Sequence, residues 1–372
     1  MQNNLIKAAS PDFRTSKKEI IKNISKMLTS NNISNGYFTK KFEEQIKKFS
    51  GAKYASTVTS GGIALELAIK SLNISGKEII LPTQTFIASA NAISRSGCKP
   101  VFCDIDPSTG CMDIFSLKKK ITKNTAAVMF VYMFGIVPTS VLEIKKLCKK
   151  KRLYLIEDVA HAHGGSVRGH KTGSIGDIGC FSFYATKILS IGEGGAITTN
   201  NKKLYSKVEI LKNHGRVKTE ENFREISNNY RLSETQAIIG LSQAKFLKKN
   251  IKHRNKIAKI YINELKKYNY FEFVNIEKES INTFWRFPVY LKNSIDRSSL
   301  QKNLLKKHNI KITWMYYPLC HQQKIYKLQK KKLPLSEKYI HLLINLPTHT
   351  YITNNIARYV IKKLIFEIEK KY

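Results

Sequence analysis

Residues 157–195 read EDVAHAHGGSVRGHKTGSIGDIGCFSFYATKILSIGEGG and carry an acid and an amine near the ends of short apolar runs. Asp158 follows the apolar run 153–156, and Lys187 follows the run 179–183. Open α/β sheets bind their ligands beyond the carboxyl ends of the strands. We therefore expect Asp158 and Lys187 to face one site at the edge of a sheet.

Upstream of this segment, short apolar runs alternate with stretches whose apolar residues have helical spacing. This alternation predicts a mostly parallel sheet with helices on both faces. Two lysine-rich amphipathic helices are expected ahead of it, over residues 15–30 and 36–49. The expected strands cover 54–59, 78–81, 99–103, 126–133 and 153–156, and the expected helices between them cover 63–71, 87–96 and 140–148.

Beyond residue 199 the pattern becomes mainly helical, with a polar loop expected over 219–229. Ser233 and Gln236 form a predicted capping box for a helix that continues through Leu247 and extends toward Tyr268. We expect a large domain over residues 1–245 and a smaller α+β domain over 246–372. The smaller domain is expected to contain strands over 283–291 and 311–315 and helices over 298–307, 336–343 and 354–370.

The net charge of +37 suggests nucleic acid or another anionic partner. Only 11 of the 64 basic residues are arginine, and the lysines are spread along the whole chain, which favours a bias in composition over a nucleic-acid site. No apolar run approaches the roughly 18 residues that span a bilayer. We expect a cytoplasmic protein with no nucleic-acid partner and no membrane insertion, and its six cysteines to be reduced and buried.

An acid and an amine in this setting fit the needs of pyridoxal 5'-phosphate (PLP), which requires a lysine, a carboxylate for its ring nitrogen, donors for its phosphate and an aromatic ring against it. The apolar surroundings of Lys187 favour a lowered pKa. Ser60, Gly61 and Gly62 form a turn before a helix, whose N-terminus can bind an anion. A metal site at Asp158 and the nearby histidines is an alternative that lacks a clear further ligand, so no metal is expected.

With these residues the chain resembles the DegT/DnrJ/EryC1/StrS family, the PLP-dependent sugar-nucleotide aminotransferases with the aspartate aminotransferase fold. The resemblance extends from about Gly36 to about Ile365 and is strongest in residues 157–199. Supporting motifs are TSGGIALELA at 59–68, TFIASANAI at 85–93, NYRLSETQAIIG at 229–240, YYPL at 316–319 and LPTH at 346–349. It implies a fold type I PLP enzyme with a large α/β domain and a smaller α+β C-terminal domain.

The resemblance also implies a role for individual residues and a homodimer with shared active sites. Gly62 departs from the family pattern, in which threonine follows the Ser-Gly pair, so one hydroxyl donor to the phosphate is missing. The implied roles are Lys187 as the Schiff-base lysine, Asp158 as the partner of the ring nitrogen, His161 as a contact of the phenolic oxygen, Phe86 as the stacking ring, Ser182 with the backbone of Gly61 and Gly62 as the phosphate cup, and Asn229 as a phosphate contact from the partner subunit.

The implied reaction is a ping-pong transfer of an amino group from L-glutamate to a nucleotide-linked keto sugar. The expected acceptor is a 4-keto-6-deoxyhexose, whose product would enter surface polysaccharide synthesis, including that of lipopolysaccharide. Alternatives are a 3-keto sugar, a cyclitol ketone or a small phosphorylated ketone. A nucleic-acid-binding protein and a PLP-binding regulator without turnover are more distant alternatives. Selectivity for the sugar is expected to depend on loops around Gly36, Arg216 and Tyr316.

Overall fold

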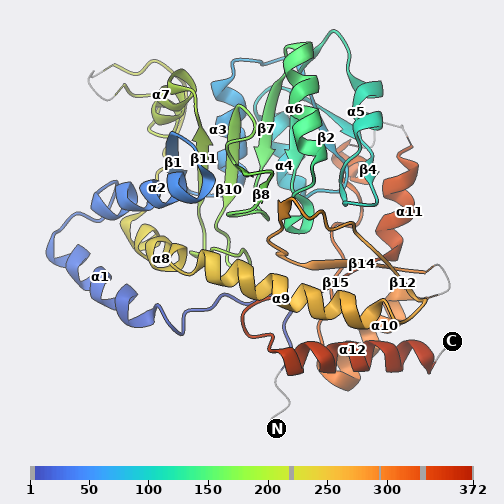
Figure 1. Ribbon diagram of the computed structural model, residues 1–372. Coiled ribbons are helices and arrows are strands. Elements are labelled where there is room, and N and C mark those ends of the chain that lie inside the picture. Colours follow the sequence, from blue (N-terminus) through green and yellow to red (C-terminus); the bar gives the residue numbers. More distant parts are fainter. Residues whose placement is uncertain (1–4, 218–221, 293–294, 327–331, 371–372) are drawn as a thin grey trace.

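The computed structural model describes residues 5–217, 222–292, 295–326 and 332–370, and a seven-stranded sheet lies at its centre (Figure 1). Every neighbouring pair from β10 to β3 is parallel, whereas β11 is antiparallel to both of its neighbours. The expectation of a mostly parallel sheet is therefore confirmed. In spatial order the strands are β1 (Tyr54–Val58), β11 (Gly195–Thr199), β10 (Ile178–Ser182), β7 (Tyr154–Asp158), β6 (Thr125–Val131), β2 (Glu78–Pro82) and β3 (Lys99–Cys103).

Helices cover both faces of this sheet. Successive side chains of a strand point to opposite faces, so the apolar strands of a mostly parallel sheet need cover on both sides. Ile79 and Leu81 of β2 pack in one hydrophobic cluster with α3, α4 and α7, whereas Ile80 packs in another with α2, α5 and α6. All six cysteines are buried and unpaired, as expected. The helices are α2 (Tyr37–Ser50), α3 (Gly61–Ser71), α4 (Ile87–Arg95), α5 (Ile114–Lys120), α6 (Ser140–Lys151) and α7 (Lys202–Leu211).

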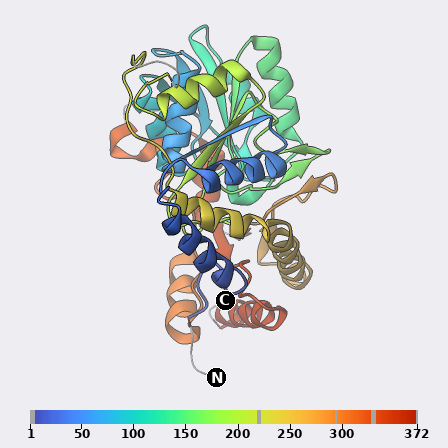
Figure 2. The ribbon, with the colours of Figure 1, turned by 90° about the vertical axis from the view of Figure 1, so that its left-hand side faces the viewer.

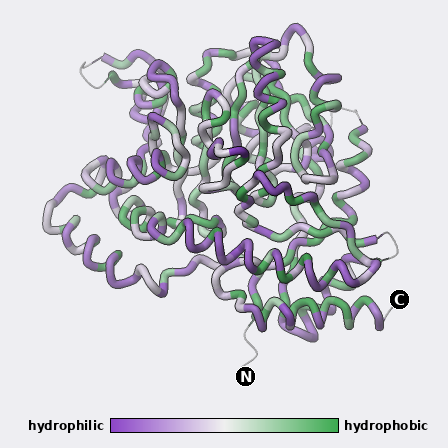
Figure 3. The backbone as a smooth tube through the Cα atoms, viewed as in Figure 1, coloured by the Kyte–Doolittle hydropathy of each residue, from purple (hydrophilic) through white to green (hydrophobic). Residues whose placement is uncertain are grey.

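A second, antiparallel sheet lies below the first in the view of Figure 1, with α9, α10 and α12 around it. The rotated view in Figure 2 shows α12 and α10 at the same end of the molecule. In Figure 3 the tubes of α9 and α12 alternate between hydrophobic and hydrophilic turns, the pattern of helices with one buried face. These elements are β12 (Phe271–Phe273), β14 (Phe287–Leu291), β15 (Leu343–Leu346), α9 (Leu247–Leu265), α10 (Arg297–His308), α11 (Pro334–Leu342) and α12 (Asn354–Glu369).

The remaining elements are α1 at the start of the chain, α8 before α9, and several short strands and turns. No helix of the described residues has the length and hydropathy needed to cross a membrane. These elements are α1 (Lys17–Thr29), α8 (Glu234–Ala244), β4 (Ile105–Asp106), β5 (Cys111–Met112), β8 (Ser166–Val167), β9 (His170–Lys171), β13 (Ser280–Ile281) and the 3₁₀ turns η1 (Met133–Gly135), η2 (Cys320–Gln322) and η3 (Lys324–Tyr326).

Three sequence-based expectations for the C-terminal region are wrong. Residues 311–315 form no strand: Ile310 and Thr313 make only isolated bridges, to Ile6 and Asn345, and the third strand of the sheet is β15. The strand expected over 283–291 begins only at Phe287. A turn at residues 245–246 separates α8 from α9, so the long helix is two helices. Packing of distant segments, invisible to local periodicity, decided each case.

The predicted capping box is present: the Ser233 side chain accepts from the N–H of Gln236, and the Gln236 side chain accepts from the N–H of Ser233. The domain boundary at residues 245/246 stays a prediction, although it coincides with the turn between α8 and α9. In the expected loop over 219–229, residues 219–221 lie outside the described residues, and 222–229 contain no helix or strand.

Candidate active site

A cavity of about 680 Å³ lies where the carboxyl ends of β6, β7 and β10 meet the amino ends of α3 and α4. Segments from the C-terminal region, around Trp285 and Tyr316, close its other side. The structure brings seven of the eight predicted site residues to this cavity. They are Gly61, Gly62, Phe86, Asp158, His161, Ser182 and Lys187.

Asp158 is the last residue of β7, and its carboxylate is buried at the floor of the cavity. One carboxylate oxygen accepts a hydrogen bond from Ser89 Oγ at 2.9 Å, and the other accepts from the N–H of Ala160 at 3.1 Å. Burial raises the pKa of this carboxyl group, while these two hydrogen bonds and the charge of Lys187 oppose the increase. Ser89 and Ala160 therefore hold the carboxylate in place and favour its ionised form.

Lys187 lies in the loop after β10, and its Nζ is 4.5 Å from the centroid of the Trp285 ring. Burial of the ammonium group lowers the pKa of Lys187 to about 8; Asp158 opposes this decrease and Arg286 adds to it. A substantial fraction of Lys187 is therefore a neutral amine near pH 8, the form that acts as a nucleophile and as a base. The lowered pKa predicted from the apolar surroundings is confirmed in direction.

His161 lies between two aromatic side chains. Its ring stacks on Trp285 with the centroids 3.9 Å apart and the planes 14° apart, and its Nε2 is 3.4 Å from Tyr316 Oη. Burial, with the nearby charge of Lys187, lowers the pKa of His161 well below its usual value, so the ring is neutral at neutral pH. Its Nδ1 is buried without a hydrogen-bond partner among the described residues. A neutral imidazole can therefore donate to or accept from a bound molecule.

His163 has a structural contact instead. Its Nε2 is 2.8 Å from the carbonyl oxygen of Ser182, so it links the loop after β7 to the end of β10. Burial lowers the pKa of His163 to about 3. Among the described residues, no three His, Cys, Asp or Glu side chains are placed to hold a metal ion.

The glycine turn at the start of α3 presents backbone N–H groups to the cavity. Ser60 caps the helix by accepting from the N–H of Ile63 at 3.2 Å. The first N–H groups of a helix have no partner within it and suit an anion. A Cβ at Gly61 would come within 2.5 Å of Ser182 Cβ, whereas a Cβ at Gly62 would meet nothing closer than 3.9 Å. Gly61 is therefore sterically required, and Gly62 is not.

These groups fit PLP. The glycine cradle and Ser182 suit a phosphate, the Asp158 carboxylate suits a pyridinium N–H, and the Lys187 amine suits an aldehyde carbon. Phe86, the N-cap residue of α4, is 55% exposed, and its ring lies 5.4 Å from that of Tyr316 on the open side of the cavity.

Asn229 is the predicted site residue that the fold does not bring to the cavity of its own chain. It is exposed, and it bridges to Asn213 beyond the end of α7. Gly36 and Arg216, named as neighbours of the sugar site, also do not line this cavity, whereas Tyr316 does.

Among the residues that line the cavity, sequence reasoning missed Trp285 and Arg286. Trp285 contacts His161 and Lys187, and its Nε1–H donates to the carbonyl oxygen of Thr186 at 2.7 Å. Both residues lie in a segment that the apolar pattern assigned to a strand. No local motif marks them, because their contacts join parts of the chain about 100 residues apart.

Comparison with known proteins agrees with this fold. The sequence profile of the DegT/DnrJ/EryC1/StrS aminotransferase family matches residues 14–365, and the chain belongs to this family of PLP-dependent transaminases. A GDP-perosamine synthase from Escherichia coli O157:H7 is 34% identical over 336 residues, which are 89% of this chain and 90% of the relative. A UDP-4-amino-4,6-dideoxy-N-acetyl-beta-L-altrosamine transaminase from Campylobacter jejuni subsp. jejuni is 31% identical over 357 residues, 94% of each chain.

The fold also matches solved structures. That of Helicobacter pylori PseC, described as an aminotransferase involved in the biosynthesis of pseudoaminic acid, superimposes with a TM-score of 0.92 at 27% identity, covering 99% of this chain and 100% of that one. The chain is thus an α/β transaminase whose relatives are named for nucleotide-linked amino sugars.

Proposed function

We propose that this enzyme transfers the amino group of L-glutamate to a nucleotide-linked 4-keto-6-deoxyhexose, as a step toward a surface polysaccharide. One observation carries the proposal: Asp158 and Lys187, at the ends of neighbouring strands, face one cavity together with the glycine turn of α3. The name of the 4-amino-4,6-dideoxy sugar transaminase from Campylobacter supports the position of the keto group. The name of the GDP-perosamine synthase supports a nucleotide-linked sugar.

PLP, when bound, supplies an electron sink for the negative charge that develops on the carbon losing a proton. In the proposed arrangement, Asp158 would hold the ring nitrogen as N–H, and the hydrogen bonds from Ser89 and Ala160 favour the ionised carboxylate that this task needs. Ser182 and the N–H groups of Gly61 and Gly62 would bind the phosphate. His161 would contact the phenolic oxygen, and Phe86 would lie against the ring.

Lys187 moves the proton in both half-reactions. A pKa of about 8 leaves enough neutral amine near neutral pH to accept a proton from the donor's Cα, and enough ammonium to return one. Trp285 contacts Lys187, and its indole N–H donates to the carbonyl oxygen of Thr186. These contacts restrict the loop that carries Lys187, so the amine stays near the reacting carbon. In the second half-reaction the same amine acts on the carbon that was the ketone of the sugar.

We also propose a homodimer with shared active sites. Asn229 is exposed and does not line the cavity of its own chain, as expected of a residue that contacts the phosphate in the partner's cavity.

The visible spectrum of the purified protein tests the function. We expect a yellow protein after PLP is added, and loss of the yellow band when L-glutamate is added, with 2-oxoglutarate as product. Lys187→Ala should bind PLP without the lysine-bound band and should release no 2-oxoglutarate. A protein that stays colourless with PLP, or a Lys187→Ala variant with normal turnover, would refute the proposal.

The acceptor is then identified by offering nucleotide-linked sugars to the aminated enzyme. Return of the yellow band with 4-keto-6-deoxyhexoses linked to GDP, UDP or dTDP is the expected result. Return only with a 3-keto sugar, a cyclitol ketone or a small phosphorylated ketone would replace the proposed acceptor and leave the chemistry intact.

A further inference from the structure

Arg286 is a buried arginine in the wall of the candidate active site. Its side chain is 4% exposed and makes no hydrogen bond or ion pair within the described part of the chain, and its Nε is fully buried without a partner. Its guanidinium lies against the Trp285 ring, whose centroid is 4.7 Å from Arg286 Cζ. A buried guanidinium without an acceptor is costly, so an anionic ligand is the natural partner of this side chain.

The other buried arginines of the described residues all have acceptors. Arg254 donates from Nη1 to the carbonyl oxygens of Phe284 and Trp285 and to Thr348 Oγ1. Arg297 donates to the carbonyl oxygens of Ile340 and Leu343. Arg254 thereby holds the backbone that carries Arg286, so the guanidinium of Arg286 stays beside the cavity.

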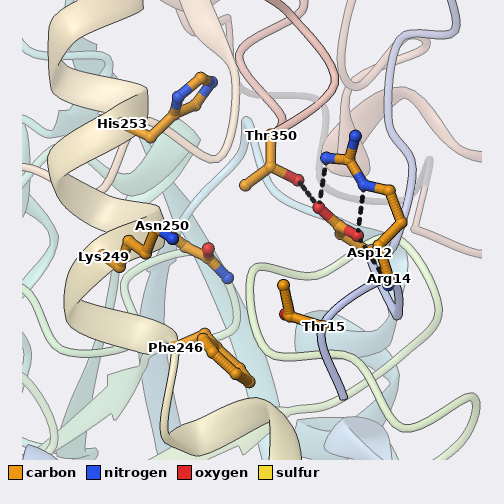
Figure 4. Close-up of a pocket in the computed structure, with 8 residues that line it drawn as sticks. All are labelled: Asp12, Arg14, Thr15, Phe246, Lys249, Asn250, His253 and Thr350. Atoms are coloured by element: carbon orange, nitrogen blue, oxygen red, sulfur yellow. Dashed lines mark hydrogen bonds and ion pairs between the residues drawn. The ribbon is translucent and has the colours of Figure 1, made fainter. Parts of the chain in front are cut away.

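Arg14 shows how the same protein pairs an arginine that lies on an aromatic ring. Its guanidinium is 4.0 Å from the centroid of Tyr351, and it donates to both carboxylate oxygens of Asp12 at 3.0 and 2.7 Å. Figure 4 shows this pair, with Thr350 as a third member, beside a small cavity next to α9. Arg286 has the aromatic ring but lacks the carboxylate. By comparison with Arg14, the partner that Arg286 lacks among the described residues is a carboxylate.

The position of Arg286 suits a carboxylate of an amino donor that reacts at Lys187. Lys187 Nζ and Arg286 Cζ lie over the same Trp285 ring, at 4.5 and 4.7 Å from its centroid, so they are at most about 9 Å apart. An amino acid whose nitrogen replaces that of Lys187 has its carboxyl carbon about 2.5 Å away from that nitrogen. The diphosphate of a sugar nucleotide is on the far side of the sugar ring from the reacting carbon, hence further from Lys187.

We propose that Arg286 binds the α-carboxylate of the amino donor, so that the donor's Cα is held beside Lys187. This assignment rests on the proposed transaminase function. The planar guanidinium of Arg286 can donate two parallel hydrogen bonds to one carboxylate. Burial lowers the pKa of Arg286 to about 10, which leaves it charged at neutral pH.

The two half-reactions, measured separately by rapid mixing on the holoenzyme, test this assignment. For Arg286→Gln we expect the half-saturating concentration of L-glutamate to rise by about 30-fold or more, as for loss of one member of a buried charge pair. Arg286→Lys keeps the positive charge but loses the planar guanidinium. Its half-saturating concentration of L-glutamate should lie between those of the unaltered enzyme and Arg286→Gln. The half-saturating concentration of the keto sugar nucleotide in the other half-reaction should stay unchanged. Arg14→Gln is the matched control and should change none of these values.

L-Glutamine shows which carboxylate of the donor Arg286 binds, because it keeps the α-carboxylate but has an amide in place of the γ-carboxylate. Its dissociation constant, measured as a substrate or as a competitor of glutamate, should rise by the same factor in Arg286→Gln. A rise for glutamate alone, or a rise for the keto sugar nucleotide in place of the amino acids, would overturn the assignment. If the unaltered enzyme fails to react with any amino acid, the transaminase function itself fails, which is a different result.

Discussion

At the scale of the residue, the chain departs from its family at Gly62, and the structure shows that a side chain has room there. The Cβ position is 3.9 Å from its nearest neighbours, whereas at Gly61 it is 2.5 Å from Ser182. We expect Gly62→Thr to increase PLP affinity by roughly tenfold, since one hydrogen bond to a charged group contributes about 1.5 kcal/mol. Titration of the apoprotein with PLP measures this. Gly61→Ala, the matched change one residue earlier, should weaken binding; equal effects of the two changes would contradict the steric argument.

The ionisation of Lys187 gives a second prediction at this scale. Its amine must be neutral to attack the aldehyde of PLP, and its pKa is lowered from 10.5 to about 8. The rate at which apoprotein and PLP form the yellow band should therefore rise with pH and level off above about pH 8. Arg286→Gln removes a positive charge that lowers this pKa, so it should move the midpoint to higher pH. A rate that still rises up to pH 10 in the unaltered protein would show that the pKa of Lys187 is not lowered.

At the scale of the element, Glu234 of α8 caps the N-terminus of α2. Its carboxylate accepts hydrogen bonds from the N–H groups of Gly36, Phe38 and Thr39 at 2.8 to 3.0 Å, in a buried setting. Sequence reasoning recognised the capping box of α8 but missed this second cap, because the two helices are about 200 residues apart. The cap joins the N-terminal helices to the rest of the large α/β unit.

Removal of this cap should destabilise the protein measurably. Glu234→Ala leaves three buried or half-buried N–H groups without acceptors, and we expect a loss of about 2–4 kcal/mol in the free energy of unfolding. Urea unfolding of the apoprotein provides the measurement. Glu44→Ala removes an exposed acid of α2 that pairs with Lys47, and it should cost less than about 0.5 kcal/mol. Similar losses in the two variants would show that the Glu234 cap has no special role.

At the scale of the whole molecule, a shared active site predicts rescue between inactive subunits. Lys187→Ala and Asn229→Leu should each impair activity when PLP is limiting. If Asn229 acts in the partner's cavity, a hybrid dimer has one intact site, so a reassociated equal mixture should recover about a quarter of normal activity. Activity after mixing, compared with each variant alone, is the readout. Absence of rescue in mixtures shown to contain hybrids would place Asn229 in its own chain's site or outside the site altogether.

The sequence alone was sufficient for the central sheet and for the neighbourhood of Asp158 and Lys187. Strand and helix periodicity, together with the glycine turn at residues 60–62, are local properties, and a mostly parallel sheet gathers the carboxyl ends of its strands at one edge. The same local reasoning placed a strand at residues 311–315 and joined α8 to α9, which the structure corrects. In these places, contacts with distant segments outweigh local preference.

Only the tertiary structure decided which side chains close the cavity from the C-terminal region. Trp285 stacks on His161 and contacts Lys187, although both partners are far from it in the chain, and the guanidinium of its neighbour Arg286 lies against the same ring. Periodicity reports which face of an element is buried but not what that face touches. Asp158 and Lys187 could therefore be predicted from the apolar runs that precede them, whereas the Trp285 ring at Lys187 and the guanidinium beside it, which has no side-chain hydrogen bond or ion pair among the described residues, arise from packing.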